Sequence, residues 1–296
     1  MKTLSVIIVN YNTKDILEKC LENLRLVFSN ELKDYKEVIV VDNGSGDGSS
    51  EMVKTKFPEV ILVETKNVGL AAGSNLGLRK STGDYILYLG SDAFPEVDTL
   101  EGMMECMEKD DSIGVATCKL LTRDSKYDMD AHRGFPTLWV SFTYFSRLYK
   151  LFPKSRLFGG YFMEYENLDV PHEIDLCISH FMLIKREVFR KIGEWDTRFF
   201  VFGEDVDFCY RVKEAGFKIM YLPQWTCVHF KGSSIGLRKE SKDVTKASSE
   251  TIKKMRVARI QARYLFYEKF YAKKYPKPLL YFLKFVHNLE ILLIKL

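Results

Sequence analysis

Short apolar runs that alternate with helical patterns constrain the fold of this sequence more than any other feature. Three runs rich in β-branched residues, a fourth apolar run and the three helical patterns between them occupy residues 4–9, 15–27, 37–41, 49–56, 60–64, 71–80 and 85–89. Unbroken apolar runs separated by helices are typical of parallel strands buried on both faces. The first 95 residues therefore predict the nucleotide-binding βαβ half of a Rossmann-like α/β domain.

Polar residues follow all four predicted strands at the points where the strands end. In an open parallel sheet, ligands bind beyond the carboxyl ends of the strands, so these positions are candidates for a binding site. The four polar segments are Asn10-Tyr11-Asn12, Asp42-Asn43-Gly44-Ser45, Lys66-Asn67-Val68-Gly69 and Gly90-Ser91-Asp92. We expect them to converge on one polar rim.

Two of these segments have the chemistry that a nucleotide requires. Asp42 precedes a Gly/Ser turn and can accept hydrogen bonds from a base or a ribose, although the same residues also favour an ordinary turn. Asn67, Gly69 and Asn75 surround the start of the next helix, where small residues and side-chain amides let backbone N–H groups approach a nucleotide or its phosphates. Helix capping alone would also explain this second pattern.

Two further residues are candidate ligands of a divalent metal, either Mn²⁺ or Mg²⁺. Asp92, beside Ser91, can bind a hard cation that bridges two phosphates, although a lone loop aspartate is more often a helix cap. His229 ends an apolar stretch and precedes a Gly/Ser turn. Imidazole is a common ligand of divalent metals, although a lone histidine is more often structural.

The strongest local signal is an acidic cluster at residues 199–207, a segment that we expect to be a loop. Glu204, Asp205 and Asp207 follow an apolar run and a glycine. A carboxylate held near apolar surroundings has its pKa raised toward the range of a general base. The alternative is a helix N-terminus, where acids are favoured by the helix dipole. Upstream, a strand is predicted at 181–184 and a helix from Glu187.

The chain changes character after residue 235. Nine Lys or Arg and a single acid occupy residues 253–277, and an apolar stripe with helical spacing follows at Phe282, Val286, Leu289, Leu293 and Leu296. We expect a domain over residues 1–235, with a nucleotide-binding half at 1–95 and an acceptor half at 96–235, and a basic amphipathic helical tail at 236–296. The tail is predicted to dock on a membrane surface; the alternatives are packing against the core and formation of a homo-oligomer.

Charge and hydropathy restrict the location and the partners. The first apolar run is too short for a signal peptide, and no segment has the roughly 18 uninterrupted apolar residues of a spanning helix. We therefore expect a cytoplasmic protein, peripheral at the inner face of the cell membrane. A formal net charge of +4 is too small to indicate a nucleic-acid partner, and none is expected.

Six motifs in this order resemble the inverting family 2 glycosyltransferases of the GT-A fold, and among them the bacterial rhamnosyltransferases of cell-surface polysaccharide assembly. The motifs are VIIVNYN, VVDNGSGDGS, KNVGLAAGSNLGL, LYLGSDAFP, FFVFGEDVDFCYRV and CVHFKGSS. The resemblance implies transfer of a sugar, with inversion, from a nucleoside diphosphate-sugar to a hydroxyl of a glycan or lipid-linked acceptor. It includes dTDP-rhamnose among the candidate donors.

The resemblance also implies residue roles on the donor side. Asn10 and Tyr11 would line the base pocket, and Asp42 would bind the base or the ribose. Asn67 and Gly69 would hold the nucleoside and its phosphates.

On the catalytic side, Asp92 falls on the last acid of the family's DxD-type motif, and His229 falls on a histidine that often completes the metal site. Asp205 falls on the catalytic base, with Glu204 beside it.

Two positions depart from the family pattern. Gly90 stands where relatives often carry an acid or an amide, so the metal would rely on Asp92, His229 and the diphosphate oxygens. Ser179-His180 replaces small residues next to the donor sugar, which predicts a bulkier pocket wall and argues against dTDP-rhamnose. The alternative functions are a catalytically degenerate nucleotide-sugar-binding protein, a nucleotidyltransferase, and a membrane- or partner-binding module.

Overall fold

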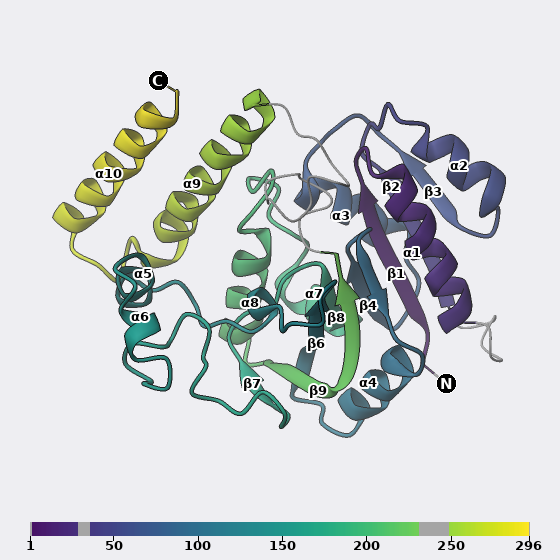
Figure 1. Cartoon of the computed structure of the whole chain (residues 1–296), viewed down its shortest axis with the longest axis horizontal. Coiled ribbons are helices and arrows are strands. Elements are labelled where there is room, and N and C mark those ends of the chain that lie inside the picture. Colours follow the sequence, from purple (N-terminus) through teal and green to yellow (C-terminus); the bar gives the residue numbers. More distant parts are fainter. Residues whose placement is uncertain (1, 29–35, 231–248, 296) are drawn as a thin grey trace.

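The computed structural model describes residues 2–28, 36–230 and 249–295 (Figure 1). Its first half alternates strands and helices as predicted, with ends that differ from the predicted ones by at most one residue. These elements are β1 (Leu4–Asn10), α1 (Lys14–Val27), β2 (Lys36–Asp42), α2 (Ser49–Lys56), β3 (Ile61–Glu64), α3 (Leu70–Lys80) and β4 (Tyr85–Leu89).

The second half combines strands, helices and long connections. Its elements are β5 (Ala93–Pro95), α4 (Thr99–Glu108), β6 (Ile113–Thr122), the 3₁₀ turn η1 (Met129–Ala131), α5 (Leu138–Phe145), α6 (Leu148–Leu151), β7 (His172–Ile174), β8 (Phe181–Lys185), α7 (Arg186–Ile192), α8 (Glu204–Glu214) and β9 (Lys218–His229). Of these, the sequence predicted β8 and α7.

All the strands of the described chain belong to one nine-stranded, mostly parallel sheet. Its order is β3-β2-β1-β4-β8-β6-β9-β5, with β7 paired to β9 outside this path. Strand β8 runs antiparallel between β4 and β6, and it thereby joins the parallel first half to the parallel β6-β9 pair. This insertion brings the residues before β8 close to the ends of β4 and β9, where the candidate site lies.

Two hydrophobic cores cover the two faces of the sheet. Helices α1, α2 and α4 pack on one face, and α3, α7 and α8 pack on the other. Alternate residues of β1 divide between the cores, since Val6 and Ile8 face the first and Ile7 faces the second. This two-sided burial is the reason why the strands read as continuous apolar runs.

The prediction of a loop over residues 199–207 is wrong for its last four residues. Helix α8 begins at Glu204, and Gly203 precedes it in a left-handed conformation with φ of 78°. The acids therefore occupy the first turn of a helix, where the dipole favours negative charge. The alternative interpretation of this segment is confirmed.

The tail contains two helices, α9 (Ser249–Tyr271) and α10 (Lys277–Lys295), that lie side by side, with α9 on the side of α8 (Figure 1). Helix α9 packs on the domain through a third apolar cluster made of Phe199, Tyr210, Ala262, Phe266, Tyr267 and Tyr271. Of the alternatives predicted for the tail, α9 therefore shows packing against the core. Along α10, Phe282, Leu289 and Leu293 of the predicted stripe are exposed, while Leu296 and the predicted boundary at 235 lie outside the described residues.

Candidate functional site

The predicted polar rim exists at the carboxyl ends of β1, β2 and β4. Asn10 donates from Nδ2 to Asp42 Oδ1 at 3.0 Å and to Ser45 Oγ at 3.1 Å. The Thr13 hydroxyl donates to Asn10 Oδ1 at 2.6 Å and lies 3.0 Å from Ser91 Oγ. The structure therefore brings Asn10, Asp42 and Ser91 into one hydrogen-bonded network. Its members are already satisfied by one another, which holds the rim in a fixed shape.

The loop before α3 is organised by a residue that the sequence reasoning passed over. Asn43 accepts from the Val68 N–H at 2.9 Å and donates to the Gly69 carbonyl at 3.2 Å and to Asn67 Oδ1 at 3.4 Å. Gly69 has φ of 89°, and a Cβ there would lie 2.5 Å from the Phe200 carbonyl oxygen. Gly69 is therefore required for the close approach of this loop to the segment before α8.

The two remaining predicted nucleotide contacts differ in their surroundings. Both polar atoms of Asn75 are engaged by the backbone of Trp195, at 2.9 Å to its carbonyl and 3.0 Å from its N–H. Asn75 thus ties α3 to the chain after α7 and does not face the rim with a free amide. Tyr11 is 46% exposed and leaves its ring accessible to a ligand.

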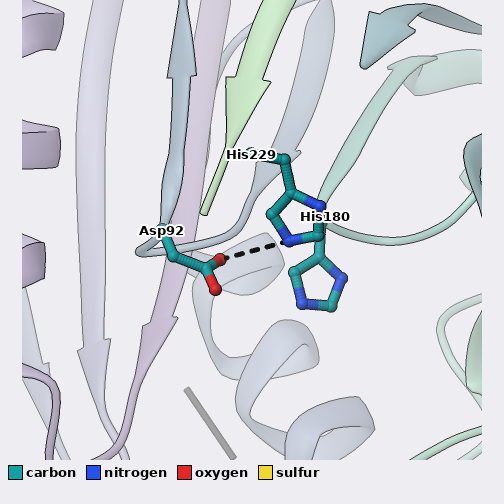
Figure 2. A group of neighbouring side chains, drawn as sticks. All are labelled: Asp92, His180 and His229. Carbon is teal, nitrogen blue, oxygen red and sulfur yellow. Dashed lines mark ion pairs between the residues drawn. The ribbon is translucent and has the colours of Figure 1, made fainter. Parts of the chain in front are cut away.

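Two buried side chains, Asp92 and His229, and one partly buried side chain, His180, meet near the ends of different strands (Figure 2). Asp92 follows β4, His229 ends β9, and His180 precedes β8; one ligand atom from each lies within 4.8 Å of the others. His229 Nε2 is 3.6 Å from Asp92 Oδ1, which is an ion-pair distance but too long for a hydrogen bond. Among the described residues, both Asp92 oxygens, His229 Nε2 and His180 Nδ1 have no hydrogen-bond partner.

The electrostatics of this cluster favour a cation. His229 donates from Nδ1 to Asp128 Oδ2 at 2.8 Å, so the imidazole lies between two carboxylates. Burial opposes a charge on His229, but Asp92 and Asp128 outweigh it and raise its pKa to about 9. Burial likewise opposes ionisation of Asp92, but His229 holds the pKa of Asp92 below its ordinary value. A carboxylate and two imidazoles with unsatisfied buried atoms fit a divalent metal, and Asp128 orients one of the ligands.

A second group of buried charges lies next to this cluster, at the start of α8. The Ser179 hydroxyl donates to Glu204 Oε1 at 3.2 Å. Asp205 Oδ2 lies 3.6 Å from the Arg133 guanidinium. Since Ser179 and His180 are consecutive, the chain before β8 connects the acids of α8 to the candidate metal cluster.

The two acids of this pair have different charge states. Burial, followed by the charge of Asp205, raises the pKa of Glu204 to about 8. Burial also raises the pKa of Asp205, but the Arg133 guanidinium opposes that rise. Burial therefore favours the neutral form of Glu204 strongly, whereas Asp205 has a cation beside it that favours its carboxylate form.

Sequence reasoning missed Asp128 and Arg133 and treated His180 only as a wall of the pocket. All three come from segments without a recognisable motif, and Asp128 and Arg133 flank the η1 turn. Only an unusual density of polar residues between 124 and 133 marked this segment. The assignments of Asp92 and His229 to a metal, and of Asp205 and Glu204 to catalysis, stay predictions.

Comparisons with known proteins agree on one family. The family model described as "Glycosyl transferase family 2" matches residues 5–193. Rhamnosyltransferase WbbL of Escherichia coli strain K12 is 24% identical over 237 residues, which cover 76% of this chain and 82% of WbbL. Glycosyltransferase GlyA of Streptococcus pneumoniae serotype 4 is 34% identical over 102 residues, which cover 33% of this chain but 14% of GlyA.

Two solved structures share the fold over almost the whole chain. Mannosyltransferase PcManGT from Pyrobaculum calidifontis, in complex with GDP-Man and Mn²⁺, has a TM-score of 0.59 at 19% identity, covering 99% of this chain and 73% of that one. GalNAc-T7 with UDP, GalNAc and Mn²⁺ has a TM-score of 0.58 at 17% identity, covering 97% and 55%. The predicted GT-A glycosyltransferase fold is confirmed.

Proposed function

Because this chain belongs to glycosyltransferase family 2, we propose that it transfers a sugar from a nucleoside diphosphate-sugar to a hydroxyl of a glycan or lipid-linked acceptor, with inversion at the anomeric carbon. The observation that carries the proposal is the adjacency of two buried groups: a cation-binding cluster around Asp92 and His229, and a carboxylate, Asp205, with a raised pKa. A cation held by the first group can bind a diphosphate, and the carboxylate of the second group can accept the proton of an attacking hydroxyl.

The donor side of the site is the rim at the ends of β1 and β2. In this proposal Tyr11 supplies an exposed ring next to the base. Asp42 keeps spare acceptor capacity for a ribose or a base, because a carboxylate accepts more bonds than the two it receives from Asn10 and Ser45. Asn67 and the backbone around Gly69 border the diphosphate.

The leaving group is bound at the cluster between β4 and β9. Asp92 and His229 would hold a divalent metal, which supplies positive charge to the departing diphosphate and substitutes for a general acid. Both solved relatives described above contain Mn²⁺ with a nucleotide or a nucleotide-sugar. This supports Mn²⁺ as the first ion to test, with Mg²⁺ as the alternative.

Asp205 acts as the general base. It takes the proton of the acceptor hydroxyl while that oxygen bonds to the anomeric carbon and the bond from this carbon to the diphosphate oxygen breaks on the opposite face. Arg133, at 3.6 Å, favours the ionised form of Asp205, and burial favours the neutral form of Glu204 beside it. The configuration at the anomeric carbon is inverted as a consequence.

A donor panel tests this proposal and identifies the sugar. UDP-, GDP- and dTDP-sugars, including dTDP-rhamnose, are incubated with the protein and Mn²⁺ or EDTA, and release of the nucleoside diphosphate is measured with and without glycan or lipid-linked acceptors. We expect release from one donor that EDTA abolishes and that acceptor accelerates, with an inverted product by NMR. Donors that bind and never turn over, with every acceptor supplied, would favour the degenerate sugar-binding alternative.

The peripheral location forms a second part of the proposal, and it rests on the exposed face of α10. In the part of the chain that the structure describes, no helix is both long and apolar enough to span a membrane. Large apolar side chains are nevertheless exposed on α10 and on the nearby α5-α6 segment: Tyr281, Phe282, Phe285, Leu289, Leu292, Leu293, Trp139, Phe142, Phe145, Leu151 and Phe152. Exposed apolar groups at this density mark an interaction surface.

The charges around these side chains fit an anionic lipid surface. The sequences of α5, α6 and α10 contain one acid, Glu290, and it is paired with Arg263 of α9. Lys150, Lys277 and Lys284 are exposed beside the apolar residues. Aromatic rings interspersed with lysines suit the headgroup region, where each cation contributes about 1 kcal/mol. Two basic residues of α9 are engaged by the protein itself, because Arg263 pairs with Glu290 and Lys269 pairs with Asp207.

Vesicle sedimentation tests the docking face. We expect the wild-type chain to pellet with phosphatidylglycerol vesicles and not with phosphatidylcholine vesicles, and the double variant F282Q/F285Q to lose most of this binding. Val97, which is 55% exposed on the loop before α4, provides the control variant V97Q. Wild-type protein that stays in the supernatant would contradict docking on the membrane. A double variant that shifts from dimer to monomer would instead assign this face to contact with a second copy of the chain.

A further inference from the structure

Position 90 requires glycine because neighbouring side chains leave no space for a Cβ, and not because of its backbone conformation. Its φ is outside the left-handed region, so the main chain there would accept other residues. A Cβ, however, would lie 2.8 Å from Asp92 Oδ1 and 2.9 Å from His180 Cδ2. The Gly90 N–H donates to the His180 carbonyl at 2.9 Å, which fixes the two segments against each other. The space that a side chain at position 90 would take is thus occupied by His180.

His180 reaches this space from a strand other than those that carry Asp92 and His229. Its ring centroid is 4.8 Å from that of His229, and the two rings lie together beside the Asp92 carboxylate (Figure 2). Nδ1 of His180 is buried and has no hydrogen-bond partner among the described residues. An imidazole held beside a buried carboxylate and a second imidazole has the arrangement of a metal ligand.

We propose that His180 is a third protein ligand of the divalent metal, with Gly90 as the residue that makes room for it. The proposal depends on the proposed function only in that both use the same ion. Metal–ligand distances of about 2.0–2.2 Å place three ligand atoms of one ion about 3 to 4 Å apart. The separation of 3.6 Å between His229 Nε2 and Asp92 Oδ1 already lies in this range. The other separations, within 4.8 Å, need a closure of about 1 Å at most.

Three protein ligands change the order of binding. A site with one carboxylate and one imidazole depends on diphosphate oxygens to complete it, whereas a site with Asp92, His180 and His229 retains the ion before any nucleotide arrives. Two imidazoles also favour Mn²⁺ and Co²⁺ over Mg²⁺, because nitrogen ligands suit transition metals and Mg²⁺ prefers oxygen. The chain is therefore expected to bind Mn²⁺ without nucleotide.

Metal titration without a nucleotide tests the proposal. Free Mn²⁺ is measured by its EPR signal as protein is added, for the wild-type chain, H180A and the control H172A, which removes an imidazole from outside the cluster. We expect H180A to weaken Mn²⁺ binding at least about tenfold, since even partners of ligands contribute that much, and H172A to match the wild type. The absorption bands of bound Co²⁺ should change in H180A only. Wild-type affinity in H180A would overturn the proposal.

A compensating pair removes the ambiguity of a variant that merely misfolds. G90A, which forces a Cβ between Asp92 and His180, is expected to weaken Mn²⁺ binding as H180A does. The double variant G90D/H180A places a carboxylate in the space that the imidazole has left and should regain affinity to within about fivefold of the wild type. A double variant no better than H180A would contradict the exchange of ligands. Normal Mn²⁺ binding without sugar transfer would leave this site standing and reject the proposed function.

Discussion

The acids on the two sides of the first turn of α8 differ in how closely their carboxylates are paired with cations. On the side that faces α9, Asp207 is 0% exposed and both its oxygens are paired, one with Arg211 at 2.8 Å and one with Lys269. On the side that faces β8, and among the residues that the structure describes, Asp205 has one cation at 3.6 Å, and the Glu204 carboxyl has the Ser179 hydroxyl as its side-chain partner. Asp205 and Asp207 are therefore only two positions apart, yet the charge of Asp207 is neutralised by two close cations and that of Asp205 is not.

The difference separates stability from chemistry. A buried charge with close partners resists proton exchange, and its removal leaves those partners uncompensated. A buried charge with one distant partner costs free energy in the folded state and retains affinity for a proton. We therefore expect substitutions on the β8-facing side to change rates and substitutions on the α9-facing side to change folding.

Asp205→Asn should have the largest effect on activity. Loss of a general base is expected to lower kcat about 10²- to 10⁴-fold, which corresponds to roughly 3 to 5 kcal/mol of barrier. The urea midpoint should be unchanged or higher, because a neutral amide avoids the burial of a charge. The check is donor turnover and urea unfolding on the same preparation. A full-rate variant would remove Asp205 from the mechanism.

Asp207→Asn should show the reverse pattern. Arg211 and Lys269 would lose their shared carboxylate, so the free energy of unfolding should fall by about 3 kcal/mol. Lys269 keeps Asp196 at 2.7 Å, and this contact limits the loss. Urea unfolding measures the change, and turnover at low temperature should stay near that of the wild type. Equal stability with reduced turnover would invert the comparison between the two sides.

Arg133→Gln should shift the pH dependence of catalysis. The guanidinium opposes the rise in the pKa of Asp205, so its loss should raise that pKa further. Because the base must be ionised, the acid limb of kcat/KM should move to higher pH, and the rate at alkaline pH should recover. An acid limb at the wild-type position would show that Arg133 does not tune the base.

Glu204→Gln should have the smallest effect on activity at pH 7. Gln resembles the protonated acid that a pKa of about 8 implies, and it can still accept from Ser179, so we expect activity within about threefold of the wild type. The folded-state pKa of Glu204 lies above the ordinary 4.5. Between pH 4.5 and 8 the carboxyl therefore ionises in the unfolded chain before it ionises in the folded one, so the stability of the wild type falls as pH rises through this range. Urea midpoints across this range should decline in the wild type and stay flatter in the variant. A hundredfold loss of activity would mean that Glu204 works as a carboxylate.

Local patterns were sufficient for the first half of the fold. Strands β1 to β4 and helices α1 to α3 were predictable to within one residue, because burial on both faces makes a strand uniformly apolar and polar residues mark its end. The same logic placed Asn10 and Asp42 on one rim, where their side chains do bond.

The second half was less predictable because its pairings join distant segments. β6 pairs with β9, almost one hundred residues later, and β8 enters the sheet against both of its neighbours' directions. Neither arrangement follows from a local period. The loop predicted over residues 199–207 ends four residues earlier than expected, because helix α8 begins at Glu204 after the left-handed Gly203.

The sequence by itself determined the family, the α/β class, the nucleotide-facing rim and the identity of Asp92, Asp205 and His229 as candidates, since motif order and strand-end polarity are written along the chain. The tertiary structure alone decided that His180 joins Asp92 and His229, that Arg133 faces Asp205, and that α9 packs on the domain. The physical reason is that coordination and pKa depend on distances between side chains that strand pairing brings together, and one-dimensional spacing does not encode these distances.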